Sequence, residues 1–383
     1  MSTLQPLAGT RIVSLEQFGA GPYGTMFLAQ LGAEVIKIEN PGIGGDPARY
    51  TGPYRLGEAD SEYFQSWNLN KRSVTLDIKS ESGRAAFLSL VAEADAVVNN
   101  LRGDLPSTLG LDYATLSRTK ASIVCVHISA YGRDGERAAW PGYDYLMQAE
   151  SGLMSLTGEP AGPPSRFGAP SLIDHMTGMT AMVGLLAALL EARRSGRGCD
   201  VDLNLLDVAL HQLGYTAVWY LNEGLRPTRQ PRSAHFSVAP AQTLATQDGW
   251  IFVMCMTEKF WAALVGALGC PDLRADPRFA NVRARHEHRE ELTEVLEQEL
   301  RRQPSRYWLE KFAGLLPAAP VLDVATALSS DFVTDSGMIQ SVEHPHKAGL
   351  RVLSNPLKID GHRPVAQACS PLGADTGELL DTP

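Results

Sequence analysis

The sequence contains few cysteines, and none forms the closely spaced pairs that bind zinc. Its 383 residues include five, which lie far apart at Cys125, Cys199, Cys255, Cys270 and Cys369. A disulfide framework is typical of small secreted chains, and a zinc site requires Cys or His ligands at short spacings. We therefore expect no disulfides and no metal site. Dispersed thiols that stay reduced predict a cytoplasmic protein.

Positive charge and long apolar runs are also scarce. Lys and Arg number 34 against 43 Asp and Glu, so the formal net charge is −9. A chain with net negative charge has no general attraction to nucleic acid, although it can still contain a local basic pocket. The most apolar stretch, 176–190, has 15 residues, and a membrane span needs about 20. Residues 1–11 lack the basic region and apolar run of a secretory signal. We expect neither a nucleic-acid partner nor a membrane span.

The first half of the chain alternates strand and helix patterns. Short apolar runs predict strands at 11–16, 34–39, 73–77, 96–98 and 123–128. Helical spacing predicts helices at 23–31 and 80–92. Such alternation predicts a parallel sheet covered by helices on both faces. A further strand at 200–205 and a helix at 206–220 precede a Pro- and Arg-rich run, 226–232, which is typical of a linker.

A smaller α+β unit is predicted after this linker. Strands at 241–246 and 250–255 flank Asp248-Gly249, a pair typical of hairpin turns, and helices are expected at 258–268 and 287–302. We expect a large α/β domain made of 1–195 and 330–383 and a small α+β domain at 233–316. The two linkers would be 196–232 and 317–329.

A glycine-rich motif follows the first predicted strand and opens a helix. Gly19, Gly21 and Gly24 have the G-x-G-x-x-G spacing, and Glu39 lies twenty residues after Gly19. This pattern is typical of dinucleotide-binding folds. Pro22 lies within the motif and has no amide hydrogen to donate to a phosphate. The glycines could serve a nicotinamide dinucleotide site, a tight turn alone, or a turn that receives a different nucleotide.

Several segments, taken together in their order, resemble the class III CoA-transferase family. They include 6–13 (PLAGTRIV), 20–22 (AGP), 31–39 (LGAEVIKIE), 68–73 (NLNKRS), 142–144 (GYD), 151–154 (SGLM), 344–345 (HP) and 371–373 (PLG). Their order is maintained over more than 300 residues. The resemblance implies a large Rossmann-like domain, a smaller domain and an interlocked homodimer. It also implies acyl-CoA and a carboxylic acid as substrates, with no tightly bound cofactor.

The resemblance identifies Asp174 as the nucleophile. Asp174 lies within 168–178 (GAPSLIDHMTG), ahead of an apolar run. An aspartate with an ordinary pKa of about 3.9 is an anion at neutral pH and can attack a thioester without a general base. Covalent catalysis would then proceed through an aspartyl anhydride and an aspartyl-CoA thioester. From position alone, Asp174 is interpreted as the N-cap of a helix over 176–190. The two roles are compatible.

The resemblance also implies an acyl site formed by Tyr143, His175 and His235. Related racemases have a histidine at the position of Tyr143, where the transferases have a tyrosine. Because tyrosine, with a pKa of about 10, is a poor general base at neutral pH, we expect transfer rather than racemisation. Residues 234–237 contain no glycine, unlike the glycine-rich lid of formyl-CoA transferases. This difference argues against formate or oxalate as the acceptor.

The expected CoA-binding residues come from three segments. They are Phe18, Gly19, Ala20, Lys71, Arg72, Asn100, Leu101 and Arg102. Arginine and lysine at these positions would bind the phosphates, although composition alone predicts that Lys71 and Arg72 are solvated loop charges. Family frequency favours succinyl-CoA as the donor and a short dicarboxylate as the acceptor. An α-methylacyl-CoA racemase, a non-catalytic CoA-binding protein and, more distantly, an NAD-dependent oxidoreductase remain as alternatives.

Overall fold

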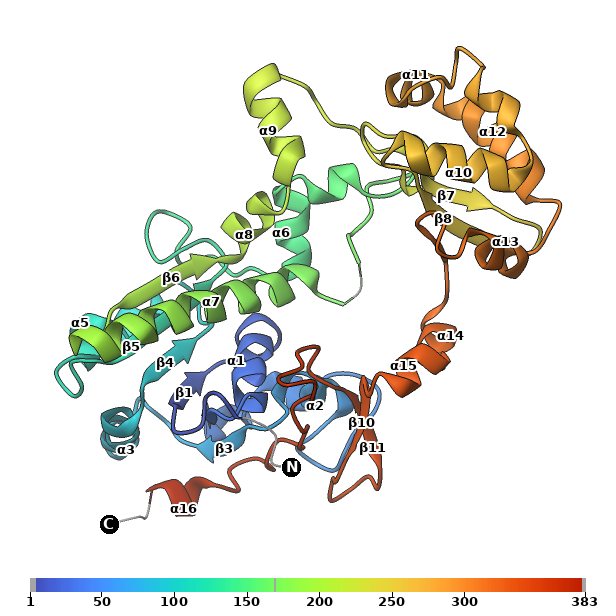
Figure 1. Cartoon of the computed structure of the whole chain (residues 1–383). Helices are drawn as coiled ribbons and strands as arrows, with labels where there is room; N and C mark the ends of the chain where they lie inside the picture. Colours follow the sequence, from blue (N-terminus) through green and yellow to red (C-terminus); the bar gives the residue numbers. More distant parts are fainter. Residues whose placement is uncertain (1–4, 169, 381–383) are drawn as a thin grey trace. The chain divides into compact units, whose positions relative to one another are not determined.

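The structure, a computed structural model, describes residues 5–168 and 170–380 (Figure 1). The chain divides into two compact units. Unit 1 is assigned 1–151, 168–213 and 331–383, and unit 2 is assigned 152–167 and 214–330.

The unit boundaries differ from the expected domain boundaries. β6 (Asp200–Asn204) and α8 (Leu205–His211) lie in the expected linker 196–232 but belong to unit 1. Residues 152–167, expected in the large domain, belong to unit 2. The physical reason is long-range pairing, because β6 completes the sheet by bonding to β5. Local composition does not reveal such pairing.

Six strands form the sheet of unit 1, and every neighbouring pair is parallel, as predicted. Their order, β3-β2-β1-β4-β5-β6, is that of a doubly wound Rossmann-like sheet. The order reverses between β1 and β4, where ligands bind in this class of sheet. The strands are β1 (Arg11–Leu15), β2 (Glu34–Glu39), β3 (Arg72–Thr75), β4 (Ala96–Asn99), β5 (Val124–Ser129) and β6.

Three long helices pack on this sheet or on each other. α3 (Glu81–Glu93) buries Phe87 and Val91 against Val13 and Val97 on one face of the sheet. α1 (Ala20–Gln30) and α7 (Leu172–Ser195) pack closely together. A Cβ on Gly24 of α1 would lie 2.6 Å from the carbonyl oxygen of Gly178 in α7, so glycine is required for this approach.

α7 is longer than the predicted helix. By length and apolar composition alone it could cross a membrane, a test that core helices also pass. Here one face of α7 packs against α1, β5, β6 and α8, and 39% of its most apolar window is buried. It begins at Leu172, with Ser171 as the N-cap, so Asp174 lies in the first turn and is not the cap.

Shorter elements complete unit 1. β10 and β11 form an antiparallel hairpin, and α16 contacts β3 and α3. These elements are α2 (Glu62–Asn68), α4 (Leu105–Thr108), α5 (Tyr113–Leu116), α6 (Asp144–Glu150), α15 (Asp331–Asp335), β10 (Ile339–Val342), β11 (Leu350–Leu353) and α16 (Thr376–Leu380).

Unit 2 is built on an antiparallel sheet of order β7-β8-β9. The predicted hairpin between β7 and β8 is confirmed. The helix predicted at 206–220 is instead two helices, α8 and α9, and Gly214, the first residue of α9, has a positive φ of 54°. The elements are α9 (Gly214–Glu223), β7 (Ala241–Ala245), β8 (Trp250–Met254), α10 (Glu258–Leu268), α11 (Val282–Glu287), α12 (Arg289–Leu300), α13 (Ser305–Phe312), β9 (Ala318–Pro320) and α14 (Val324–Leu328).

Candidate active site

A cavity of about 260 Å³ in unit 1 lies where the sheet order reverses. We name it the nucleophile cavity. It is lined by Gln17, Phe18, Gly19, Ala20, Asn100, Leu101, Arg102, Ile128, Ser129, Ala130, Pro141, Gly142, Tyr143, Asp174 and Leu205. The segments after β1 and β4 and the end of β5 supply most of this lining, because the carboxyl ends of parallel strands share one edge of the sheet. Eight of the twelve residues expected at the site therefore lie together.

The Asp174 carboxylate is held at the start of α7. Its backbone N–H donates to Oδ2 of Asp144 at 2.9 Å, and the side chain is only partly open to solvent. Burial and the nearby Asp144 carboxylate raise the pKa of Asp174 to about 7. The expectation of an aspartate with an ordinary pKa is therefore wrong, because the Asp174 carboxylate holds its proton to a higher pH than an exposed one. A desolvated carboxylate is also more basic, which strengthens it as a nucleophile.

Gly19 makes room for this carboxylate. A Cβ at Gly19 would lie 2.3 Å from Oδ2 of Asp174, closer than any side chain can approach. The first glycine of the G-x-G-x-x-G motif thus serves Asp174, and the third packs α1 against α7. The packing of Gly19 and Gly24 therefore explains two of the three glycines without a bound dinucleotide.

The turn that carries Gly19 is anchored on both sides. Asn100 accepts from the backbone N–H of Gln17 at 2.9 Å and donates to its carbonyl at 2.7 Å. Phe18 adopts a positive φ of 56°, and its N–H donates to Oδ1 of Asp46 at 3.2 Å. The Phe18 ring contacts Tyr143 edge-on, with ring centroids 6.3 Å apart. We name residues 16–19 the β1 turn.

Lys71 and Arg72 are not placed to bind phosphates, which corrects the expectation from sequence. The Lys71 side chain is fully buried, and its Nζ binds the Glu16 carboxylate at 2.7 Å. Arg72 pairs with Glu34 and Asp375, each at 3.0 Å. The Lys71 charge is paired inside the protein, and the partly exposed Arg72 is paired with carboxylates, so neither is a free loop charge.

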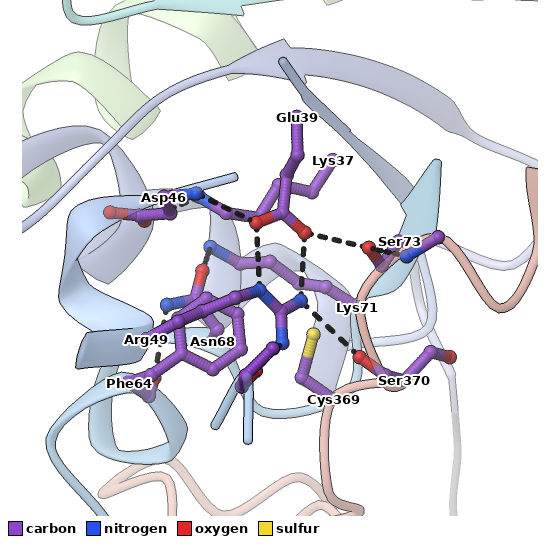
Figure 2. Close-up of polar contacts among 12 residues, drawn as sticks. Lys37, Glu39, Asp46, Arg49, Phe64, Asn68, Lys71, Ser73, Cys369 and Ser370 are labelled. Atoms are coloured by element: carbon purple, nitrogen blue, oxygen red, sulfur yellow. Dashed lines mark hydrogen bonds and ion pairs between the residues drawn. The ribbon is translucent and has the colours of Figure 1, made fainter. Parts of the chain in front are cut away.

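Glu39 is likewise satisfied internally. Its carboxylate accepts from Nε and Nη2 of Arg49 at 2.8 and 2.7 Å (Figure 2). Ser73 and the backbone N–H of Asp46 donate to it as well. These donors lower the pKa of Glu39 to about 2 despite its burial. Its hydrogen bonds are therefore made within the protein, which weakens the nicotinamide interpretation.

The two histidines expected at the acyl site do not line the nucleophile cavity. His175 stacks on Tyr23 and packs against Trp67, with ring centroids 4.1 and 4.9 Å apart. It lines a separate cavity of about 560 Å³, and burial lowers its pKa. His235 belongs to unit 2, where its ring stacks on that of Tyr215. Only Tyr143 of the expected acyl residues lines the nucleophile cavity.

A second, largely apolar cavity of about 220 Å³ adjoins the nucleophile cavity, because Gln17 and Leu101 line both. Leu76, Ile78 and Leu105 supply apolar walls, and Lys79 is the lysine in its lining. Sequence reasoning missed this cavity. Its walls come from separate loops that only the folded sheet brings together. Within residues 5–168 and 170–380, no group of three or more His, Cys, Asp or Glu could hold a metal ion.

The sheet order and the buried carboxylate at its reversal point define an α/β enzyme with an acidic nucleophile candidate. The chain matches the model of CoA-transferase family III over residues 7–376 and belongs to that family. It is an acyl-CoA:carboxylate CoA-transferase, which confirms the resemblance found in the sequence.

Its relatives support the transferase branch. The chain is 34% identical to the acetyl-CoA:oxalate CoA-transferase of Acetobacter aceti, over 93% of this chain and 90% of that protein. It is 33% identical to the human succinyl-CoA:glutarate CoA-transferase, over 90% of this chain and 78% of that protein. A crystal structure of a CAIB/BAIF family protein from Brucella suis superposes with a TM-score of 0.84 at 32% identity, covering 99% of each chain.

Proposed function

We propose that the enzyme transfers CoA through covalent intermediates on Asp174. The observation that supports this is the position of Asp174: a desolvated carboxylate directly against the Gly19 backbone, in a cavity at the reversal point of the sheet. Among the described residues that line this cavity, Asp174 is the sole carboxylate and histidine is absent. A racemase would need a second acid–base group across the α-carbon.

In the proposed reaction, Asp174 attacks the acyl-CoA carbonyl and CoA leaves as a thiolate, forming a mixed anhydride. The thiolate then attacks the aspartyl carbonyl, releasing the donor acid and leaving an aspartyl-CoA thioester. The acceptor carboxylate attacks this thioester, forming a second anhydride and the thiolate. Attack of the thiolate on the new acyl carbonyl releases product and the Asp174 carboxylate. Because anhydrides hydrolyse readily, the bound substrate must exclude water.

We propose that the thiol end of CoA occupies the nucleophile cavity and that the rest extends into the adjoining apolar cavity. Both cavities are lined by Gln17 and Leu101. Arg102 and Lys79 then replace Lys71 and Arg72 as the candidate phosphate ligands. Arg102 is half-exposed and pairs with Asp104 at 2.9 Å. A surface pair of this kind contributes about 0–1 kcal/mol, so a phosphate can compete for the arginine.

For substrates, we propose succinyl-CoA as the donor and a short dicarboxylic acid as the acceptor. One relative is the succinyl-CoA:mesaconate CoA-transferase of Haloarcula hispanica, 33% identical over 97% of this chain and 94% of that protein. The oxalate enzyme from Acetobacter aceti shows that oxalate belongs among the acceptors to be tested. The absence of glycine from residues 234–237 therefore does not exclude oxalate as an acceptor.

We also propose a cytoplasmic homodimer. Large apolar side chains are exposed on α7, α9 and α15, including Leu190, Leu221 and Phe332, the last 83% exposed. Groups of exposed apolar residues are typical of association surfaces. Light scattering coupled to size-exclusion chromatography should give about twice the chain mass of 41.4 kDa. A monomer would contradict this proposal.

The decisive experiment traps the covalent intermediate. The protein is incubated with succinyl-CoA, quenched in acid and digested, and the peptide containing Asp174 is examined by mass spectrometry for CoA or succinyl adducts. Asp174→Ala should lose both the adduct and all transfer, whereas transfer retained by Asp174→Ala would contradict the proposal. Asp207→Asn is the matched control, because Asp207 also lies in the first turn of a helix, α8, but is exposed. Exchange of an α-proton in deuterated water without acceptor acid would indicate racemisation instead.

A further inference from the structure

A buried ion pair lies beneath the β1 turn. Lys37 comes from β2, and Asp46 precedes the short helical turn Pro47–Tyr50. Nζ of Lys37 lies 2.9 Å from Oδ2 of Asp46, and both side chains are completely buried. Figure 2 shows the pair among Glu39, Arg49 and Lys71. Burying a charge costs several kcal/mol unless the ion is well partnered. The stability of this pair therefore depends on the hydrogen bonds that surround it.

The pair bonds to the β1 turn on both sides of Gln17. Lys37 Nζ donates to the carbonyl of Glu16 at 2.8 Å. Asp46 Oδ1 accepts from the N–H of Phe18 at 3.2 Å. Asp46 is itself fixed, because its own N–H donates to Glu39 at 3.0 Å and its Oδ1 also accepts from the N–H of Ala48. The β1 turn is therefore hydrogen-bonded to an ion pair that is itself held by further hydrogen bonds.

The turn needs such an anchor because its backbone is strained. Phe18 has a positive φ of 56°, a conformation that costs about 1–2 kcal/mol for a residue other than glycine. The same conformation directs the chain so that Gly19 meets the Asp174 carboxylate. It also sets the Phe18 ring against Tyr143. A shift of about 1 Å at a reacting centre can reduce the rate about 100-fold.

Lys37 stays charged in this setting. Burial opposes its positive charge, but the carboxylates of Asp46, Glu16 and Glu39 outweigh that effect and raise the pKa of Lys37. The interaction with Asp46 is therefore an ion pair, and removing Asp46 leaves the buried Lys37 without its direct partner, with Glu16 and Glu39 as the remaining nearby carboxylates.

We propose that Lys37 and Asp46 are positioning residues for CoA transfer: the pair holds Phe18 in its left-handed conformation and so places Gly19 and Tyr143 around Asp174. The inference rests on Asp174 as the proposed nucleophile. Neither residue lines the nucleophile cavity. Asp46 borders the adjoining cavity, but its side chain is occupied by Lys37, Phe18 and Ala48.

The test separates rate from binding. Asp46→Ala should lower kcat about 10- to 100-fold, in line with a displacement of up to about 1 Å, while KM for succinyl-CoA stays within about threefold. Asp60→Ala is the matched control: it is also a buried aspartate of unit 1, whose partners are Gln65, His344 and the Ser61 backbone. It should lose stability but keep kcat. If Asp46→Ala does not fold, Asp46→Asn, which keeps the acceptor for Phe18, replaces it with a smaller expected loss.

A double-mutant cycle with Phe18→Gly tests whether Asp46 affects kcat through the backbone conformation of Phe18. Glycine adopts positive φ without steric cost, so Asp46→Ala should reduce kcat much less in the Phe18→Gly background than in the wild type. Equal losses in both backgrounds, or a wild-type kcat in folded Asp46→Ala, would overturn the proposal. The wild type is tested for the Asp174 adduct in the same experiment. A missing wild-type adduct would count against Asp174 as nucleophile, and an adduct formed equally fast by Asp46→Ala would count against the positioning pair alone.

Discussion

Replacing Asp174 by asparagine should stabilise the protein, and the gain should grow with pH. The pKa of Asp174 is raised to about 7 in the folded protein, against 3.8 for an ordinary aspartate. The folded state therefore binds the proton more tightly than the unfolded state. Below pH 3.8 Asp174 is protonated in both states and does not lower the free energy of unfolding. Its destabilising effect grows as pH rises and reaches its full size above about pH 7.

The size of this cost follows from the two pKa values. At 1.36 kcal/mol per pH unit, the difference corresponds to at most on the order of 4 kcal/mol at pH 8. The carboxylate is partly open to solvent, so the measured value should lie below this limit, at about 2–4 kcal/mol. Asparagine has nearly the same shape, and the bond from the backbone N–H of residue 174 to Asp144 remains possible.

Urea unfolding of the wild type and Asp174→Asn at pH 5 and pH 8 measures the effect. The advantage of Asp174→Asn in the free energy of unfolding should increase by about 1–2.5 kcal/mol between the two pH values. Asp207→Asn, an exposed first-turn carboxylate, should show no such increase. An advantage that is the same at both pH values would refute the argument that Asp174 is desolvated.

Other consequences follow for activity and folding. The rate constant kcat/KM should rise with pH up to about 7, as Asp174 loses its proton, and then level off in a pH–rate profile. Asp144→Asn removes a carboxylate that raises the pKa of Asp174, so the rising limb should move to lower pH. Gly19→Ala should reduce kcat about 100-fold, because its Cβ would meet Oδ2 of Asp174, whereas Gly266→Ala, with open space at the Cβ, should keep normal kinetics. Lys71→Met leaves a buried carboxylate unpaired, so urea unfolding should show a loss of about 3–5 kcal/mol, with KM for CoA unchanged in the folded enzyme.

Much of the fold was predictable because it depends on local pattern. The apolar runs at 34–39 and 123–128 became strands of one parallel sheet, since hydrophobic periodicity is a property of neighbouring residues. The residues Phe18 to Ala20 and Asn100 to Arg102 were predicted to act together and do line one cavity. Both segments follow strands of a parallel sheet, so the topology brings them to one edge.

The charge pairs were not predictable in the same way. Lys71 meets Glu16 across 55 residues, and Arg72 meets Asp375 across 303. A basic pair in a polar segment has the same local pattern whether it faces solvent or is buried. Asp46 showed only an Asp-Pro pair typical of a turn start, with nothing to indicate its bond to Phe18.

The sequence by itself determined the parallel α/β architecture, the family and the identity of Asp174 as the candidate nucleophile. These depend on apolar periodicity and on the order of short segments along the chain. Only the tertiary structure decided which cations are available to a ligand, which residues hold the β1 turn, and how far the Asp174 carboxylate is desolvated. Exposure, ion pairing and desolvation depend on groups that approach through space. For Asp174 the pKa is raised first by burial and then by Asp144, which lies 30 residues away.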